Sequence, residues 1–363
     1  NIAYGAKKLA FGKDYILPKP FDPRLITEIP PAVAKAAMES GVATDPITDW
    51  DKYRDELSDR MGSDNKLVRL LMNRAKMDAK RVVYTEADQL NVLKAAQIAY
   101  EEGIAEPILL GNREIILELK EEIGFDADVL IIDPKTKEEA EKRERYAHKF
   151  WKSRERRGVT LLDAQKLMRE RSYFASMMVL EGDADAMLSG YSRSYPTALK
   201  PILDLIPRAH GVSKVSSTNL MLTSRGPMFL ADTAVNPDPT AEEIAKIAVM
   251  TQHTVKMFGF DPAVAMISFG NFGSSKEASP RKMRQAVEML HQQYPDMVVD
   301  GEIQMDFALN QEMLKDKFPF SKLVGKKVNT LVFPNLDAAN TTYKMLKELN
   351  GATSIGPILL GLD

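Results

Sequence analysis

Residues 80–111 read KRVVYTEADQLNVLKAAQIAYEEGIAEPILLG, and this stretch decides the fold class. Residues 81–84 are a short run of β-forming side chains, residues 91–102 carry apolar side chains at helical spacing, and residues 107–110 form a second apolar run. Gly103 ends the helix and Gly111 ends the second strand. The order strand, helix, strand predicts a parallel βαβ unit.

The same alternation continues toward the C-terminal end. We expect strands over residues 129–132, 186–190, 228–231, 264–269 and 330–334, helices over residues 136–157, 241–258, 280–294 and 338–349, and a further element over residues 200–206. Strands separated by helices favour an α/β fold with mostly parallel sheets and helices on both faces. Ligands of such sheets bind at the carboxyl ends of the strands.

Composition limits the classes of function. The 363 residues suggest two or three domains, and 49 basic against 51 acidic residues give a net charge of −2, which attracts neither nucleic acid nor an anionic membrane. The absence of cysteine excludes disulfides, thiolate metal sites and a cysteine nucleophile, and it fits a cytoplasmic protein. No apolar run reaches membrane-spanning length. No metal site is expected, because no two histidines have ligand spacing among His148, His210, His253 and His291.

The first segment differs from the rest. Five prolines fall between residues 18 and 31, which predicts an extended strap, followed by helices over residues 31–40 and 50–60. We therefore divide the chain into an extended and helical linker, residues 1–62, and two α/β subdomains, residues 63–208 and 209–363. A chain that opens inside such a segment is expected to be part of a longer protein.

Residues 235–244 form a shaped loop that enters a helix. Pro237 and Pro239 exclude a regular element, and Thr240 is placed to cap the helix that follows. A loop of this kind either holds an anion against its backbone N–H groups and the helix N-terminus, or is an ordinary turn with a capped helix.

Two further polar loops follow predicted strands. Residues 189–195 are rich in hydroxyls, contain Arg193 and precede a helix expected to end near Lys200. Residues 268–275 are again small and polar. Both either bind a phosphate or cap a helix, and neither matches a P-loop or a G-x-G-x-x-G dinucleotide motif.

Charged clusters leave similar alternatives. Asp300, Glu302 and Asp306 follow a strand end at residues 298–299 and form either a general-base pair or a hydrogen-bonding frame. Asp337 is first a candidate N-cap and second a ligand contact. The arginines at the end of the charged helix, residues 154–157, are either solvated or meet a diphosphate or 3′-phosphate.

Taken together, these segments resemble the phosphate acetyltransferase family over residues 80–362. The matching segments are residues 94–111, 181–190, 234–240, 265–269, 300–306, 333–336 and 356–362. The resemblance implies two α/β subdomains of the isocitrate/isopropylmalate dehydrogenase-like type, with coenzyme A and acetyl phosphate meeting in the cleft between them.

The opening strap carries a second resemblance. Residues 15–25, YILPKPFDPRL, and residues 31–43, PAVAKAAMESGVA, are similar to the end of a bacterial malic enzyme domain. Hybrid enzymes of that class carry a phosphate acetyltransferase-like region at their C-terminal end. The resemblance implies that malate, NADP and a divalent metal bind upstream of these residues.

The chain departs from the active transacetylase pattern in several places. Lys200 stands where active members usually have arginine, Phe272 stands where they have lysine, and Ala339 replaces a glycine. The segment in which active members carry their catalytic serine, arginine and aspartate would follow Asp363, so none of the three is assigned here. An altered pocket on a retained fold favours binding over catalysis.

Two functions from different classes follow. The favoured function is regulatory: the region binds acetyl-CoA and belongs to a cytoplasmic, homo-oligomeric malic enzyme. The alternative is an active phosphate acetyltransferase that acts on acetyl-CoA or CoA and acetyl phosphate. A third hypothesis is an oligomerisation scaffold. Neither nucleic acid nor membrane is an expected partner. We assign no catalytic residue and expect the acyl-CoA site to contain Ser189, Gly190, Ser192, Arg193, Ser194, Lys200, Arg154, Ser268, Asn271, Gly273, Asp300, Glu302 and Asn335.

Overall fold

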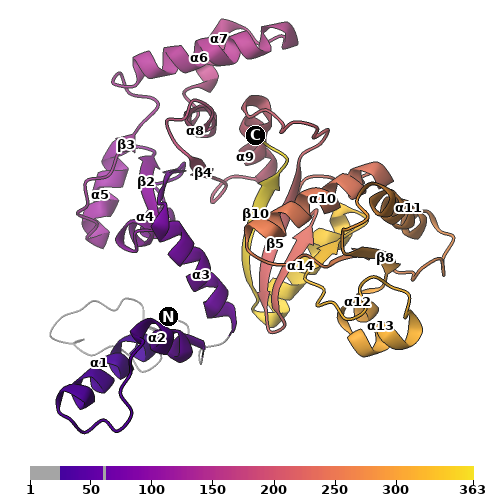
Figure 1. Ribbon diagram of the computed structural model, residues 1–363. Helices are drawn as coiled ribbons and strands as arrows, with labels where there is room; N and C mark the ends of the chain where they lie inside the picture. The colour runs from indigo at the N-terminus through magenta and orange to yellow at the C-terminus, as the bar shows by residue number, and fades with distance from the viewer. Residues whose placement is uncertain (1–24, 60–62) are drawn as a thin grey trace. The chain divides into compact units, whose positions relative to one another are not determined.

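The computed structural model describes residues 25–59 and 63–363 and divides into two compact units (Figure 1). Of the described residues, the smaller unit contains 25–59 and 63–70 with 222–227, and the larger contains 71–221 with 228–363. Helices α1 (Leu25–Glu39) and α2 (Trp50–Asp59) belong to the smaller unit, and α3 (Ser63–Met77) begins in it. The predicted strap over residues 18–24 lies outside the described residues.

A four-stranded sheet with the order β3-β2-β1-β4 confirms the predicted βαβ unit. Its strands are β1 (Lys80–Tyr84), β2 (Ala105–Leu110), β3 (Ile131–Ile132) and β4 (Ala186–Leu188). All three pairings are parallel, and Tyr84 lies between Leu109 and Leu188. The chain thus leaves β1 toward β2 on one side and returns to pair β4 on the other.

Helices cover both faces of this sheet. Because side chains alternate along a strand, Tyr84 packs with α4 (Leu90–Glu101) and α5 (Arg113–Ile123), whereas Val83 packs with Tyr146 and Phe150. The second face is covered by α6 (Ala140–Arg154), α7 (Leu161–Leu167) and α8 (Arg171–Leu180). A short 3₁₀ helix, η1 (Glu155–Arg157), follows α6.

A second sheet has six strands in the order β10-β5-β6-β9-β7-β8. The strands are β5 (Ser216–Thr223), β6 (Gly226–Ala231), β7 (Val264–Ile267), β8 (Val299–Ile303), β9 (Thr330–Val332) and β10 (Thr353–Leu360). Strands β6, β9, β7 and β8 pair in parallel. Only two residues join β5 to β6, which makes that pair antiparallel.

The second sheet is also buried on both faces. Val264 and Met266 of β7 pack with α10 (Ala241–Met257) and α11 (Ala278–Gln293), and Ala265 and Ile267 pack on the opposite face. That opposite face carries α12 (Met305–Leu309), α13 (Gln311–Lys317) and α14 (Leu336–Asn350). The remaining helix, α9 (Tyr195–Leu205), connects β4 to the second half of the chain.

Several predicted boundaries are wrong. Helix α9 does not end near Lys200; it continues past Pro201 to Leu205, because a buried face keeps the helix intact despite the N–H that proline lacks. Helix α6 begins at Ala140 and not at Thr136, since a turn held by Asp133 precedes it. Helix α1 begins at Leu25, before its predicted start at Pro31.

The sequence also failed to predict two strands of the second sheet. Strand β5 reads SSTNLMLT, and its Ser, Thr and Asn side chains are buried, so its polar composition concealed a core strand. Strand β10 contains Gly356 and Pro357, which argue against a strand. Strand β3 covers only residues 131–132 of the predicted 129–132.

The predicted α/β class with mostly parallel sheets is confirmed. The division at residues 62/63 and 208/209 stays a prediction; strands of the first sheet lie between residues 80 and 188, and those of the second between 216 and 360. Within residues 25–59 and 63–363, no helix is long and apolar enough to cross a membrane.

Candidate functional site

The loop after β4 binds a carboxylate of the chain itself, that of Glu86. The Glu86 carboxylate accepts hydrogen bonds from the N–H groups of Gly190 (3.0 Å), Tyr191 (2.7 Å) and Ser192 (3.0 Å), and from the Ser192 hydroxyl (2.5 Å). Burial raises the pKa of the Glu86 carboxyl, but these hydrogen bonds outweigh it and hold the pKa below its ordinary value. The donors proposed from sequence to cradle a phosphate are therefore occupied by Glu86.

The loop that enters α10 is built in the same way. The Asp232 side chain, 4% exposed, accepts from the backbone N–H groups of Ala234, Val235 and Asn236 at 2.9–3.1 Å. It also accepts from the Ser217 backbone and hydroxyl and from the Asn236 amide. The Asn236 amide additionally donates to the Val215 carbonyl. Asp232 thus fixes the shape of the loop from within.

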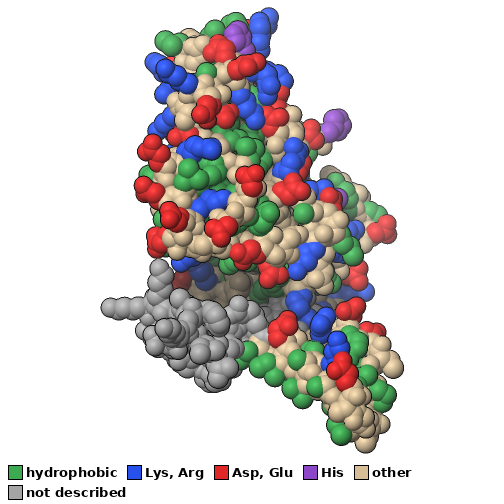
Figure 2. All heavy atoms as spheres, turned by 90° about the vertical axis from the view of Figure 1, so that its left-hand side faces the viewer, with side chains coloured by type: hydrophobic (Ala, Val, Ile, Leu, Met, Phe, Trp, Pro, Cys, Tyr) green, Lys and Arg blue, Asp and Glu red, His purple; other side chains and the backbone are tan. Residues whose placement is uncertain are grey.

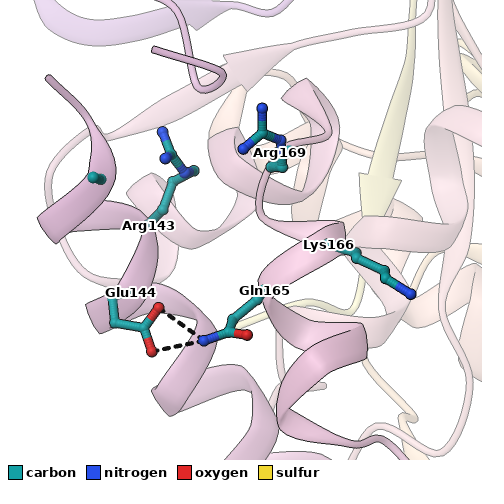
Figure 3. Close-up of a pocket in the computed structure, with 6 residues that line it drawn as sticks. Arg143, Glu144, Gln165, Lys166 and Arg169 are labelled. Carbon is teal, nitrogen blue, oxygen red and sulfur yellow. Dashed lines mark hydrogen bonds between the residues drawn. The ribbon is translucent and has the colours of Figure 1, made fainter. Parts of the chain in front are cut away.

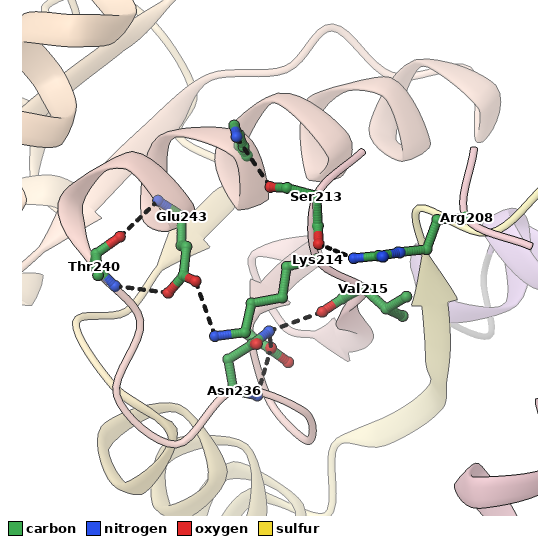
Figure 4. A network of polar contacts seen from close by, with 9 residues as sticks. Arg208, Ser213, Lys214, Val215, Asn236, Thr240 and Glu243 are labelled. Atoms are coloured by element: carbon green, nitrogen blue, oxygen red, sulfur yellow. Dashed lines mark hydrogen bonds and ion pairs between the residues drawn. The ribbon is translucent and has the colours of Figure 1, made fainter. Parts of the chain in front are cut away.

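The expected cap of α10 is confirmed. The Thr240 hydroxyl accepts from the Glu243 N–H, and the Glu243 carboxylate accepts from the Thr240 N–H, which is a capping box. Figure 4 shows Lys214 reaching the same Glu243 carboxylate, at 2.9 Å. Hydrogen bonding from the Thr240 backbone and from Lys214 lowers the pKa of Glu243.

We expect Thr240→Ala to lower the free energy of unfolding by about 1 kcal/mol, because the Glu243 N–H loses its acceptor. Urea unfolding followed by circular dichroism measures this change. Thr341→Ala is the control, since Thr341 is exposed within α14 and caps nothing. Equal effects of the two substitutions would contradict the capping role.

A third buried carboxylate organises the loop after β7. Glu302 in β8 is fully buried, pairs with Arg284 at 2.7 Å and accepts from the Gly273 N–H at 2.9 Å. Burial raises the pKa of Glu302, but Arg284 and the Gly273 N–H outweigh it, and the net pKa is lowered. Phe272, with φ at 41°, packs its ring against Phe318 and Phe320, so its side chain faces a cluster of rings.

Other predicted residues also hold the framework. The Asn271 side chain exchanges hydrogen bonds with Gln304, and the buried Ser268 hydroxyl accepts from the Gly270 N–H. Asp300 accepts from the N–H groups of Gly301 and Lys322. Asp300 and Glu302 lie within β8 and not after a strand end, which supports the hydrogen-bonding frame over a general-base pair.

The predicted N-cap at Asp337 is wrong. The Asn335 side chain caps α14 by accepting from the Ala338 N–H, and Asp337 lies in the first turn. The helix starts earlier than expected because the Asn335 backbone is extended and its amide oxygen reaches the free N–H group. The Leu336 N–H donates to the Pro237 carbonyl, which ties this cap to the loop before α10.

Two predicted segments, the arginines after α6 and the loop before α10, line one cavity of about 510 Å³. Arg154 donates to the carbonyls of Leu203 and Asp204 at the end of α9, and Arg208 donates to the Ser213 carbonyl. These carbonyls orient the guanidinium groups without cancelling their charge. No carboxylate of the described residues lines the cavity, and its four cationic side chains are Arg154, Arg157, Arg208 and Lys214. The charge of Lys214 is already offset by its ion pair with Glu243.

Arg193 and Lys200 lie apart from Arg154. They line a separate cavity of about 390 Å³ along the first half of α9, together with Tyr173 and Glu170. Arg193 lies 3.7 Å from the Glu170 carboxylate, which offsets part of the positive charge. Ser194 donates to or accepts from Thr197 within the same turn. Of the thirteen residues predicted for the acyl-CoA site, Arg193 and Lys200 line this cavity and Arg154 lines the first one, whereas the other ten line neither.

The other charged surfaces do not indicate a binding site. Figure 2 shows a face on which basic and acidic side chains are interspersed, as the net charge of −2 suggests. A depression of about 280 Å³ between α6 and α7 is lined by Arg143, Lys166 and Arg169, but Lys166 extends away from the two arginines (Figure 3). No cluster of possible metal ligands occurs within the described parts of the chain.

Sequence reasoning missed Glu86, Asp232, Arg208 and Lys214. Glu86 and Asp232 each follow a strand end closely, and that position was the available signal. Their partners lie up to 106 residues away, so no local pattern marks the contacts. Arg208 and Lys214 lie in an irregular segment between α9 and β5.

A comparison with protein-family models shows the family to which the chain belongs. The model described as phosphate acetyl/butaryl transferase matches residues 66–363. The chain belongs to this family. The solved phosphotransacetylase EutD of Staphylococcus aureus superposes with a TM-score of 0.74 at 30% identity, over 83% of this chain and 92% of that one. A phosphotransacetylase of Streptococcus pyogenes gives the same TM-score at 36% identity, over 82% of this chain and 90% of that one.

The curated relatives fall into two groups. An NADP-dependent malic enzyme of Salmonella typhimurium is 39% identical over 99% of this chain and 48% of its own length. A phosphate acetyltransferase of Thermoanaerobacterium thermosaccharolyticum is 38% identical over 82% of this chain and 91% of its own length. The chain therefore spans about half the length of the malic enzymes it matches, and it corresponds to their C-terminal part.

Proposed function

We propose that this region binds acetyl-CoA as a regulatory effector of a larger malic enzyme. The observation that carries the proposal is the cavity lined by Arg154, Arg157, Arg208 and Lys214, with no carboxylate of the described residues among its lining groups. Coenzyme A carries a diphosphate and a 3′-phosphate, and oriented guanidinium groups bind phosphate oxygens with paired hydrogen bonds. Asn236, which is buried, and Pro237 also line the cavity.

The cavity lined by Arg193 and Lys200 would bind either an anion smaller than coenzyme A or the acyl end of acetyl-CoA. Both cavities border α9, whose 11 residues span roughly 16 Å at 1.5 Å per residue. We expect replacement of Arg193 and Lys200 by alanine to weaken the effector response while malate oxidation upstream stays intact. An unchanged effector response would argue against this second cavity.

The wider assignments rest on the malic enzyme relatives. Their printed names, NADP-dependent malic enzyme, support the use of NADP by the larger enzyme. We propose in addition that the enzyme is cytoplasmic and homo-oligomeric, and that NADP and a divalent metal bind upstream of these residues. Acetyl-CoA would then act at a distance from the oxidation of malate, through a coupling free energy typically of about 1–3 kcal/mol. The sign of the effect is left to measurement.

The alternative is an active phosphate acetyltransferase, which the similarity to the Thermoanaerobacterium enzyme supports. Two residues argue against it. Lys200 is a point charge where a forked guanidinium is the family's usual group, and the Phe272 ring packs with Phe318 instead of presenting a cation. Robust formation of acetyl-CoA from acetyl phosphate by the complete protein would contradict a purely regulatory role.

The direct test measures malate oxidation by the complete protein as acetyl-CoA is added. We expect the double substitution Arg157→Ala with Arg208→Ala to shift the response to at least about tenfold higher acetyl-CoA, because two charge-assisted contacts are lost. Basal malate oxidation should not change. Arg156→Ala is the matched control, since Arg156 lies in η1 but does not line the cavity.

If the double variant responds to acetyl-CoA like the unsubstituted protein, this cavity is not the effector site. If Arg156→Ala weakens the response as much as the double substitution does, the effect comes from net charge and not from the cavity.

A further inference from the structure

A separate cavity of about 200 Å³ lies at the carboxyl ends of β1 and β4. These two strands are neighbours, but β1 is followed in the chain by α4 and β2 on its other side. The crevice between them is therefore the topological switch point of the first sheet, where open α/β sheets bind ligands. None of the cationic residues of the proposed effector cavity lines this crevice.

Tyr84 supplies an unused hydrogen-bond donor to this cavity. The side chain lines the cavity and is only 4% exposed, yet no residue in the described parts of the chain hydrogen-bonds its hydroxyl. Burial raises the pKa of the Tyr84 phenol, so the group stays protonated at neutral pH. The Tyr84 hydroxyl is open to the solvent that fills the cavity, so a bound acceptor would replace water at this donor.

A second set of polar groups lies at the mouth. The Asn91 amide donates to the Tyr191 hydroxyl at 2.6 Å, which leaves the amide oxygen as an acceptor and the hydroxyl hydrogen as a donor. Tyr191 is 56% exposed, so its ring is available for stacking. Leu188 and Val92 contribute apolar wall.

The charge of the cavity selects against anions. Glu86 lines it, its carboxylate is already satisfied by the loop of Gly190 to Ser192, and no described cationic side chain lines the same space. A phosphate or carboxylate placed here would meet an unbalanced negative charge. The volume corresponds to about six or seven water molecules at about 30 Å³ each, which is room for one ring system.

We propose that this crevice binds a small uncharged heteroaromatic ring of the nucleobase class. The ring presents an acceptor to the Tyr84 hydroxyl, exchanges hydrogen bonds with Asn91 and stacks on Tyr191. Glu86 is the residue that excludes a phosphate, because its charge occupies the position where related sheets hold anions. The ring belongs either to a free nucleoside or to the adenine of a larger ligand, and the proposal does not depend on acetyl-CoA regulating the protein.

The test uses adenosine, which has the ring and no phosphate, with binding followed by saturation-transfer NMR on the whole chain. We expect saturation transfer at millimolar adenosine, and we expect inorganic phosphate not to displace adenosine from this site. Tyr191→Ala should weaken adenosine binding about five- to hundredfold, as loss of base stacking does. Tyr84→Phe should weaken it about two- to tenfold, because a single hydrogen bond is lost.

Two further variants keep the outcome clear. Ala95→Leu fills the mouth from an exposed position on α4 and should abolish adenosine binding without unfolding the chain. Tyr100→Phe removes the hydroxyl of an exposed tyrosine of the same helix that does not line the cavity, and should change nothing. Displacement of adenosine by acetyl-CoA would identify the adenine of that ligand as the occupant, and absence of displacement would identify an independent nucleoside site.

The proposal is overturned if adenosine shows no saturation transfer at millimolar concentration, or if Tyr191→Ala and Ala95→Leu bind it as the unsubstituted chain does. It is also overturned if phosphate binds at this crevice in place of the ring. Because adenosine carries no phosphate, failure here leaves the effector cavity of Arg154 and Arg208 untouched.

Discussion

Asp232→Ala is expected to lower the free energy of unfolding by about 4 kcal/mol. The substitution leaves the backbone N–H groups of Ala234, Val235 and Asn236 without their acceptor in a site that is almost closed to water. Losing charge-assisted hydrogen bonds while buried donors remain is among the costliest single changes. Denaturant unfolding measures the loss, and the loop that forms one wall of the Arg154 cavity should lose its shape, so acetyl-CoA binding should fall with it.

Asp238→Ala is the matched control for this prediction. Asp238 belongs to the same loop and is 81% exposed, and its ion pair with Lys282 lies in contact with solvent. Exposed pairs of this kind contribute at most about 1 kcal/mol. If Asp232→Ala is no more destabilising than Asp238→Ala, the loop is not held by the buried carboxylate.

Arg284→Leu is expected to cost about 3 kcal/mol at neutral pH. The change leaves the fully buried Glu302 carboxylate without its cation, and the Gly273 N–H alone does not compensate a buried charge. Thermal or urea unfolding provides the measurement. Arg281→Leu, on the exposed side of the same helix, should stay within about 0.5 kcal/mol of the unsubstituted protein.

The pKa of Glu302 also predicts how the loss of stability in Arg284→Leu depends on pH. In the folded protein the pKa of Glu302 is lowered from 4.5, so its contribution to stability is present above that value and is lost as the pH falls through the folded pKa. Without Arg284, burial dominates and raises the pKa of Glu302, which reverses the sign. The difference in stability between the two proteins should therefore begin to narrow above pH 4.5, as the pH falls through the raised pKa of the variant, and should continue to narrow down to the lowered pKa of the unsubstituted protein. A difference independent of pH would contradict the pairing.

Local sequence signals predicted part of the fold well. The βαβ unit over residues 80–111, the capped helix at Thr240 and the polar loops after β4 and β7 follow from periodicity and capping within a few neighbouring residues. The parallel order of the sheet strands follows from the helices between them. These features were accessible because their causes are local.

The carboxylates that accept hydrogen bonds from these loops could not be predicted from local signals. Glu86 is 104 residues from Gly190, and Glu302 is 29 residues from Gly273, so a carboxylate from a distant part of the chain accepts from the N–H groups of each loop. Sequence placed anion-binding loops correctly in the chain but could not tell an internal anion from a ligand. The prediction also grouped Arg154 with Arg193 and Lys200 and missed Arg208, which joins Arg154 in one cavity only through the packing of α9.

The most direct measurement is a calorimetric titration of this chain with acetyl-CoA at two ionic strengths. We expect one binding event per chain that weakens with added salt, since phosphate and guanidinium charges attract across solvent. Arg157→Ala with Arg208→Ala should weaken it at least about tenfold, and Arg156→Ala should leave it unchanged. No binding heat at low salt, or equal affinity in the double variant, would contradict acyl-CoA recognition at the Arg154 cavity.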